Sequence, residues 1–505
     1  MKKNNSFWLK SYKMKNYDSQ AKNINVDVCI IGGGLTGIST AYYLSKKGYK
    51  IALIEKDKLL SKTSGHTTAK ITSQHGLFYK YLVDSKGEEF AKKYLEANEI
   101  AIKNIEKIII SENIECDFEN KSAYVFTQNI NEISKIKEEV NTVKKLNVVA
   151  CEFVDNIDLN LDIQGAIEFK NQAQFNPIKY ANGLLEIIEK NDGKIFENTG
   201  FVKYEKSGDN FQIITTTKNS INCKYVVLAT RYPVINFPGY YFLKMYQEMS
   251  YCIAIKPKTE VNFNGMYINS KNPTLSVKTA KFNGENIVFV SGLNNKTGNG
   301  EKIEDKYENL REKAYELFGA YEFLYEWNTE DCITLDKIPY IGDFSNFTDN
   351  LFVATGFGKW GMTTSNVAAN IITDKIIKRE NRYEDIFNAT RVEPLKNEEE
   401  LKNMIKQSVK SLVIDKFKSP KEVIDDVKND EGKIVMIGSE KIGIYKDKAG
   451  NIYAVKPVCS HLGCELSWNN LNKTWDCPCH GSRFEYTGKS IYSPSMKDLE
   501  NYNFE

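Results

Sequence analysis

The chain has 505 residues, 41% of them hydrophobic, so its length allows about three domains and its composition suits substantial hydrophobic cores. Its 68 basic and 66 acidic residues leave a net charge of +2, which argues against a field that attracts nucleic acid or an anionic membrane. No apolar run is long enough for a signal sequence or a membrane span. We therefore expect a cytoplasmic protein.

A strand, a glycine-rich turn and a helix follow one another near the N-terminus. Residues 26–31 are an apolar run, residues 32–37 read GGGLTG, and the apolar residues that come next recur at helical spacing. Such glycines let the chain turn sharply and approach a pyrophosphate, while the helix N-terminus attracts phosphate. A second apolar run, residues 51–54, ends in Glu55, where an acidic residue is expected to bind the adenosine ribose. The pattern predicts a dinucleotide site, with a plain glycine-rich turn as the alternative.

The middle of the chain predicts an inserted unit of helices and strands. Residues 87–111 and 131–145 are charged, with apolar residues at helical spacing, and are typical of solvated helices with one buried stripe. Asn176 and Pro177 suit the N-cap and first position of another helix. Apolar runs between residues 246 and 293 are separated by Asn/Gly turns and predict a sheet, which we expect to cover the cofactor.

Two later segments indicate which dinucleotide is bound. Residues 225–233 form an apolar run that ends in Ala-Thr, and residues 351–365 suggest a strand, a glycine-rich turn and the start of a helix. Both resemble the flavin-contacting segments of the D-amino-acid oxidase-like family of FAD enzymes. The resemblance covers roughly residues 20–380 and includes the segments 64–76 and 335–343. It implies FAD rather than NAD, with the last helix directing its N-terminus at the flavin ring.

The same resemblance implies an FAD-dependent oxidoreductase over residues 1–400, with a substrate subdomain at roughly 77–200 and 240–330. The residues at the matching positions are expected to bind FAD. They are Gly32, Gly34, Leu35, Thr36, Gly37, Glu55, Lys56, His66, Thr67, Thr68, Val202, Ala229, Thr230, Gly356, Gly358, Gly361, Met362 and Thr363.

Evidence about the substrate is sparse. Amino-acid oxidases of this kind hold the substrate carboxylate with an arginine, whose planar fork gives bidentate bonds. Only Arg231 is placed to reach the flavin. Tyr251, Tyr340, Lys359 and Trp360 are further pocket candidates, with core packing or solvent exposure as the alternative for each. No residue is clearly a general base, which suits hydride transfer from a neutral amine.

The C-terminal part predicts a connector and a small β domain. Residues 401–429 are rich in Lys, Glu and Asn and predict a helical connector. Short strand-like runs begin near residue 430 and predict hairpins of a separate domain over residues 430–505.

Two Cys/His pairs in this domain have the spacing of a Rieske-type 2Fe-2S site. The pairs are Cys459 with His461 and Cys477 with His480, and fifteen residues separate His461 from Cys477. In such a centre two thiolates bind one iron and two imidazoles bind the other, which raises the potential above that of an all-cysteine cluster. A tetrahedral structural zinc site is the alternative.

The residues around these pairs, CSHLGCELSW and CPCHGSRFEYTGK, resemble the Rieske proteins of cytochrome bc and b6f complexes. The resemblance implies a disulfide between Cys464 and Cys479 and a hydrogen bond from Ser482 to the cluster. Phe484 departs from it, because the high-potential relatives have a tyrosine there whose hydroxyl bonds to a ligand sulfur. We therefore expect a lower potential, since hydrogen bonds to the sulfurs raise it.

The remaining cysteines and histidines restrict the alternatives. Ten cysteines are present, and the six outside this domain are scattered singly, as buried thiols usually are. Only four histidines are present, so the cluster leaves His66 and His75. A Rieske oxygenase needs a further iron held by two histidines and a carboxylate, which is improbable here. His66 is expected either to contact flavin or substrate or to be structural.

Together the two halves resemble the bacterial Rieske-containing FAD-dependent oxidoreductases over nearly the whole chain. The resemblance implies an α/β Rossmann-like FAD-binding domain with an inserted α+β substrate domain, followed by a small all-β Rieske domain. We expect an amine-type small molecule to be oxidised by hydride transfer to FAD, and electrons to pass singly through the cluster to an external one-electron carrier. The alternatives are the reverse electron flow, into a flavin-dependent reductase, and a non-enzymatic redox sensor or carrier.

Overall fold

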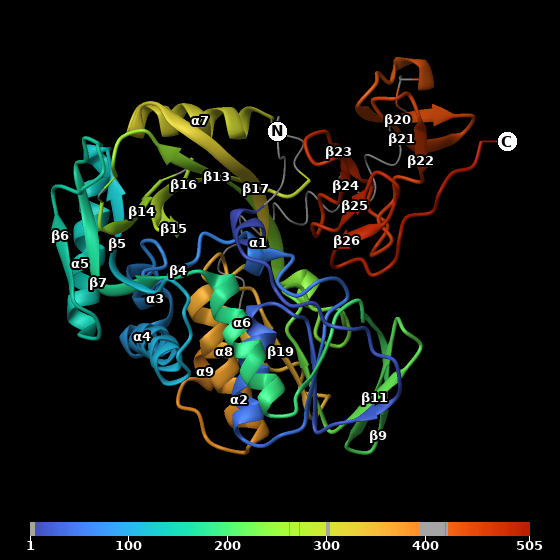
Figure 1. Cartoon of the computed structure of the whole chain (residues 1–505), viewed down its shortest axis with the longest axis horizontal. Coiled ribbons are helices and arrows are strands. Elements are labelled where there is room, and N and C mark those ends of the chain that lie inside the picture. The colour runs from blue at the N-terminus through green and yellow to red at the C-terminus, as the bar shows by residue number, and fades with distance from the viewer. Residues whose placement is uncertain are drawn as a thin grey trace.

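A computed structural model describes residues 6–261, 263–271, 273–298, 304–392, 420 and 423–504 (Figure 1). Within these residues the chain forms an N-terminal part built on two large sheets and a C-terminal domain of two small sheets (Figure 1). The predicted connector falls mostly on residues 393–419 and 421–422, which lie outside the described residues. None of the helices in the described ranges is long and apolar enough to cross a bilayer. The cytoplasmic location stays a prediction.

A mostly parallel sheet forms the centre of the nucleotide-binding part. Four of its strands are buried along their whole length, as expected for parallel strands covered on both faces. Only the edge pair β18/β19 is antiparallel. The strands, in order across the sheet, are β18 (Tyr340–Asp343), β19 (Leu351–Thr355), β12 (Tyr225–Leu228), β2 (Val28–Ile31), β3 (Ile51–Ile54) and β8 (Lys194–Phe196).

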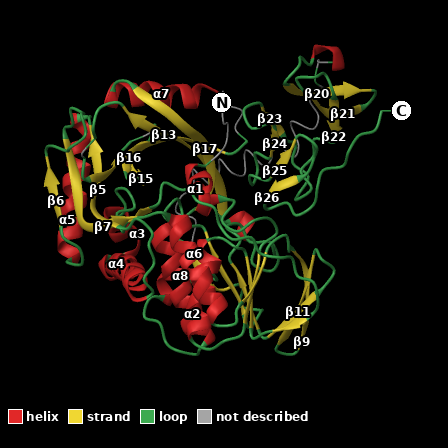
Figure 2. Cartoon of the chain, in the orientation of Figure 1, coloured by secondary structure: helices red, strands yellow, loops and turns green. Residues whose placement is uncertain are grey.

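Helices cover one face of this sheet and a second sheet covers the other, so that three layers follow one another (Figure 2). The predicted Asn176 cap is confirmed, because its side chain accepts hydrogen bonds from the N–H groups of Ile178 and Lys179. The helices are α2 (Leu35–Lys46), α6 (Pro177–Lys190) and α8 (Gly361–Ile376), with the short α1 (Phe7–Ser11) and α9 (Glu384–Phe387). The second sheet contains β1 (Ile24–Asn25), β11 (Ser220–Cys223), β10 (Asn210–Thr215) and β9 (Phe201–Ser207).

The inserted unit is a long mixed sheet with helices around it. Both predicted amphipathic helices are confirmed, and so are the strands between residues 246 and 293. The sheet runs β17 (Tyr321–Thr334), β13 (Met245–Pro257), β16 (Glu285–Lys296), β15 (Leu275–Phe282), β14 (Gly265–Asn269), β5 (Glu119–Thr127), β7 (Gly165–Gln174) and β4 (Lys70–Ile71), with β6 (Cys151–Val154) also on β7. Its helices are α3 (Tyr79–Lys86), α4 (Glu88–Ser111), α5 (Ile133–Leu146) and α7 (Glu304–Phe318).

The C-terminal domain has two small antiparallel sheets, each with its own small core. The predicted hairpin strands are present. The first sheet contains β20 (Glu431–Ile437), β21 (Glu440–Lys446) and β22 (Ile452–Val455), and the second contains β23 (Ser467–Asn469), β24 (Thr474–Asp476), β25 (Arg483–Glu485) and β26 (Ser490–Tyr492). The second sheet lies beside β17 of the N-terminal part (Figure 1).

Candidate flavin cavity and iron-sulfur centre

A cavity of about 350 Å³ lies where the parallel sheet, the long mixed sheet and the C-terminal domain meet. Most of the expected FAD contacts line it, although they come from segments far apart in the sequence. They are Gly32, Gly34, Thr36, Glu55, Lys56, His66, Thr67, Thr68, Ala229, Thr230, Gly356, Gly361 and Met362.

The glycine turn and Glu55 form the nucleotide end of the cavity. Gly32 has a φ of +115°, which favours glycine, and a Cβ on Gly37 would lie 2.0 Å from the carbonyl oxygen of Gly32. Helix α2 can therefore approach strand β2 closely. The Glu55 carboxylate accepts hydrogen bonds from the N–H groups of Gly33 (2.8 Å) and Asp57 (3.0 Å), and burial raises its pKa. These two bonds fix the carboxylate at the end of β3.

Five expected FAD contacts lie outside the cavity lining. Gly37 packs α2 against the turn, and the hydroxyl of Thr363 donates to the carbonyl oxygen of Thr72. Val202 is 55% exposed on β9, whereas its neighbour Phe201 lines the cavity, because successive strand residues face opposite sides. The five residues are Leu35, Gly37, Val202, Gly358 and Thr363.

The substrate candidates are only partly as expected. Tyr251, Lys359 and Trp360 line the cavity, but Tyr340 does not: it is buried beneath the Arg391 guanidinium, 3.8 Å from its ring centre. The Tyr340 prediction is therefore wrong, because that side chain packs within the fold. Lys359 lines the cavity with its Nζ 2.8 Å from a carboxylate oxygen of Glu248.

Arg231 lines the cavity but is already paired. Its Nη1 lies 3.1 Å from Oε2 of Glu330, and its guanidinium lies over the ring of Tyr492 at 4.8 Å. Glu330 is fully buried and also lies 3.3 Å from Nε of Arg483 in the C-terminal domain. Arg231 therefore serves the contact between the domains, and the expectation that it is placed to receive a substrate carboxylate is not supported by its pairing.

The sequence-based interpretation also overlooked Asp331, which lines the cavity on β17. Burial raises its pKa to about 6, while the charges of Lys359 and Arg231 oppose that shift. A carboxylate with a pKa near neutrality suits proton acceptance. An acidic residue in the middle of a strand gave no signal that distinguishes it from an edge residue.

The two histidines outside the C-terminal domain occupy different environments. Nδ1 of His66 lies 2.8 Å from the carbonyl oxygen of Lys62, and His66 lines the cavity. Both ring nitrogens of His75 are hydrogen-bonded, one to the Tyr94 hydroxyl and one to the carbonyl oxygen of Thr72. His75 is thus a satisfied core histidine, which agrees with the exclusion of a second iron site.

The four proposed cluster ligands converge in the C-terminal domain. The rings of His461 and His480 lie 5.2 Å apart and perpendicular. The Cys459 thiol contacts that of Cys477, which, together with N–H groups and the Ser482 hydroxyl, lowers the pKa of Cys459 to about 7. Both ring nitrogens of His461 and Nδ1 of His480 are buried without a hydrogen-bond partner. Buried polar atoms are rarely left unpaired, so these residues fit a metal cluster.

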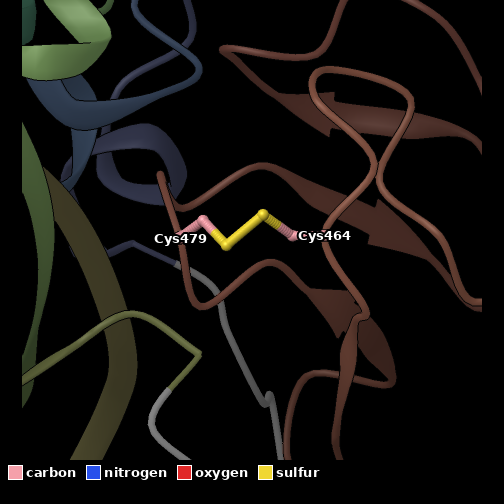
Figure 3. Close-up of a disulfide and its surroundings, with 2 residues drawn as sticks. All are labelled: Cys464 and Cys479. Carbon is pink, nitrogen blue, oxygen red and sulfur yellow. A yellow bond between two sulfur atoms is a disulfide. The ribbon is translucent and has the colours of Figure 1, made fainter. Parts of the chain in front are cut away.

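A disulfide joins the two ligand loops (Figure 3). It links Cys464 and Cys479, which matches the pairing implied by the Rieske resemblance. The Sγ atoms of Cys464, Cys477 and Cys479 lie within 4.8 Å of one another, but the disulfide leaves only Cys477 of these three as a metal ligand. Phe484 is fully buried in the same small core as the ligand cysteines. The six cysteines outside this domain are free and buried, as predicted.

The ligand loops face the N-terminal part. Phe242 packs edge-on against the rings of both His461 and His480, at 5.9 Å from each. Tyr492, on β26, lines the cavity together with Ile491, Ser493 and Met496. The C-terminal domain is therefore a wall of the cavity, which sequence patterns did not predict.

Comparisons with known proteins agree with this architecture. Residues 27–375 match the FAD dependent oxidoreductase family, and residues 420–503 match the Rieske [2Fe-2S] domain. The chain belongs to the FAD-dependent oxidoreductase family. It is 36% identical over 500 residues to YhfW of Bacillus subtilis, whose name describes a Rieske 2Fe-2S iron-sulfur protein, and the match covers 99% of this chain and 98% of YhfW. The predicted family, enzyme class and cofactors, FAD and a Rieske-type cluster, are confirmed.

More distant relatives share only parts of the chain. Gamma-glutamylputrescine oxidoreductase of Escherichia coli is 21% identical over 222 residues, covering 42% of this chain and 50% of its own. Glycine oxidase from Geobacillus kaustophilus superposes with a TM-score of 0.63 at 16% identity, covering 73% of this chain and 100% of its own. L-proline dehydrogenase from P. horikoshii has a TM-score of 0.62 at 15% identity, covering 73% of this chain and 98% of its own. These structures share the fold of the FAD part.

Proposed function

We propose that this oxidoreductase oxidises an amine-type small molecule and passes the electrons singly through its Rieske cluster to an external one-electron carrier. When bound, FAD accepts a hydride, and the cluster carries one electron at a time. The C–H bond beside the amine nitrogen breaks, and the substrate leaves as the iminium with two electrons fewer. The carrier must therefore receive two electrons in two separate steps.

The observation that carries this proposal is the shared wall of the cavity. Tyr492 lines the flavin cavity, and its cross-strand partner Arg483 follows Ser482, whose hydroxyl lies against the ligand cysteine Cys459. A short route of bonds thus connects the cavity with the cluster loops. This arrangement supports electron exchange within one chain.

The residues of the cavity support an amine as the donor. Hydride loss needs a neutral amine, and Asp331, with its pKa raised to about 6, suits acceptance of a proton from the ammonium form. Trp360 lines the cavity and stacks on His75 with ring centres 4.8 Å apart, which holds its indole in one orientation. The chain thus orients the donor and accepts a proton, while hydride acceptance belongs to FAD.

Anaerobic stopped-flow spectroscopy with a panel of primary and secondary amines tests this function. We expect one amine to bleach the flavin absorbance first and the cluster signal to change afterwards. The His480→Ala variant should still bleach its flavin but should not reduce a one-electron acceptor such as ferricyanide faster than free flavin does. Cluster reduction before flavin reduction would support the reverse electron flow, and no reaction with any amine would favour a redox carrier or sensor.

A further inference from the structure

Two lysines are buried side by side in the inserted sheet. Lys70, on β4, is 9% exposed and lines the cavity, and its Nζ donates to the carbonyl oxygen of Tyr267 (3.0 Å) and to the Ser276 hydroxyl. Lys278, on β15, is 1% exposed, and its Nζ has no hydrogen-bond partner. Each partner of Lys70 is neutral, so neither ammonium group is compensated by a hydrogen-bonded carboxylate.

The surroundings of Lys278 supply little negative charge. Its Nζ lies over the rings of Trp8 and Phe289, at 5.6 and 5.8 Å from their centres. Glu119 is the acidic residue that acts on it, but this carboxylate lies 3.6 Å from Lys121 and accepts a hydrogen bond from Gln174. Burial lowers the pKa of Lys278 to about 7, and burial followed by the charge of Lys278 lowers that of Lys70.

Such a pair is unfavourable without an anion. Removing a charge from water is costly unless an opposite charge replaces the solvent, and two cations close together oppose each other as well. Other cavity cations have acidic partners: Lys58 pairs with Glu197 (2.6 Å), Lys62 with Asp57 (3.1 Å), and Arg231 and Lys359 as described above. Lys56 lies at the nucleotide end, beside Glu55.

We propose that Lys70, supported by Lys278, binds an anionic group of the substrate, a carboxylate. This inference deepens the proposed function, because it takes the ligand of this wall to be the amine donor. Ser276, Thr274 and Asn294 line the same wall and can donate hydrogen bonds to the second carboxylate oxygen. With Asp331 on β17 for the amine, the donor is an amino acid or another amine that bears a carboxylate.

Binding to the oxidised, FAD-loaded protein tests the site without turnover. The probes are acetate and its neutral isostere acetamide, and the readouts are the flavin absorbance spectrum and tryptophan fluorescence, since Trp327 and Trp360 line the cavity. We expect acetate to bind more tightly than acetamide. Lys70→Met should weaken acetate binding roughly 10- to 100-fold, as expected for a hydrogen bond to a charged group, and should leave acetamide binding unchanged.

Three further variants separate the site from general effects. Lys70→Arg should restore most of the acetate affinity, and Lys278→Met should reduce it less than Lys70→Met does, because Lys278 acts from behind. Lys58→Met, which removes a paired cation of the same cavity, should bind acetate like the unmodified protein. Equal affinity for acetate and acetamide, or unchanged acetate binding in both Lys70→Met and Lys278→Met, would overturn the proposal. If carboxylates bind but no amine is oxidised, the proposed function fails while this site stands.

Discussion

The flavin cavity and the cluster site differ in how far the protein satisfies its own polar groups. At the nucleotide end of the cavity, the Glu55 carboxylate already accepts two backbone hydrogen bonds. At the cluster site, both ring nitrogens of His461 and one of His480 are buried and unpaired. An unpaired buried polar group is unfavourable, so the cavity can persist without FAD, whereas the cluster site depends on the cluster.

The two parts also differ in the size of their cores. The N-terminal part has three extensive apolar cores, whereas the C-terminal domain has two small ones. Small domains bury too little surface to be stable alone and commonly rely on disulfides or metals. The Cys464–Cys479 disulfide and the cluster thus stabilise the Rieske domain, and the large core stabilises the FAD part. This comparison predicts where each substitution acts.

The largest expected effect comes from removing a cluster ligand. His480→Ala should abolish the cluster, so that iron and acid-labile sulfide fall from about two each per chain to near zero. The Rieske domain should then unfold at a lower temperature, while FAD stays bound. Metal analysis and differential scanning calorimetry measure both effects. His75→Ala, which removes a hydrogen-bonded core histidine, should keep the cluster, and zinc in place of iron would contradict the ligand assignment.

The next effect concerns the boundary between the parts. Glu330→Gln would leave Arg231 and Arg483 without their shared carboxylate, and breaking a buried ion pair typically costs about 3–5 kcal/mol. We expect the flavin-to-cluster electron transfer to slow and the Rieske domain to become sensitive to proteolysis. Stopped-flow spectroscopy and limited proteolysis measure these changes. Glu205→Gln, at an exposed pair with Lys203, should change neither; a Glu330→Gln protein that behaves the same way would show that the domains do not dock through this triad.

The disulfide should contribute less. It closes a loop of 15 residues, for which loop-closure entropy predicts about 3 kcal/mol. Cys464→Ser should therefore lower the free energy of unfolding of the Rieske domain and speed cluster loss, as followed by the visible spectrum during chemical denaturation. Cys116→Ser serves as the control, because Cys116 is a free buried thiol of the FAD part. Equal cluster lifetimes in the two variants would argue against a stabilising role.

The smallest effect tunes the cluster without altering its ligands. Phe484→Tyr should add a hydrogen bond to a ligand sulfur, worth about 0.5–1.5 kcal/mol, which corresponds to a potential roughly 20–65 mV higher for a one-electron couple. Ser482→Ala should lower the potential by a similar amount, because its hydroxyl contacts Cys459. Protein-film voltammetry measures both. Unchanged potentials in both variants would mean that these side chains do not act on the cluster.

Local patterns predicted the architecture well. The glycine turn before α2, the Asn176 cap and the hairpins of the Rieske domain depend on neighbouring residues, so short segments of sequence contain the signal. The disulfide pairing came from the Rieske resemblance. Most FAD contacts were predicted because they lie on family motifs, but Val202 was wrong because strand alternation turns its side chain to solvent.

The contacts between distant segments could not be predicted. Glu330 and Arg483 belong to different domains, and Tyr492 reaches the cavity only because those domains dock. Lys70 and Lys278 each occupy a strand position that usually reads as an exposed charge, and only the folded sheet brings them together. Composition and periodicity contain no information on such pairings.

The packing of Phe242 on both cluster histidines sets an order for the biogenesis of the holoprotein. In the docked arrangement His480, Cys459 and Cys477 are each at least nine-tenths buried, so a scaffold protein that delivers iron and sulfide has no path to them. Cluster insertion must therefore precede docking of the Rieske domain. Docking then completes maturation, because it covers the newly filled ligands and at the same time closes the wall of the cavity in which FAD is held.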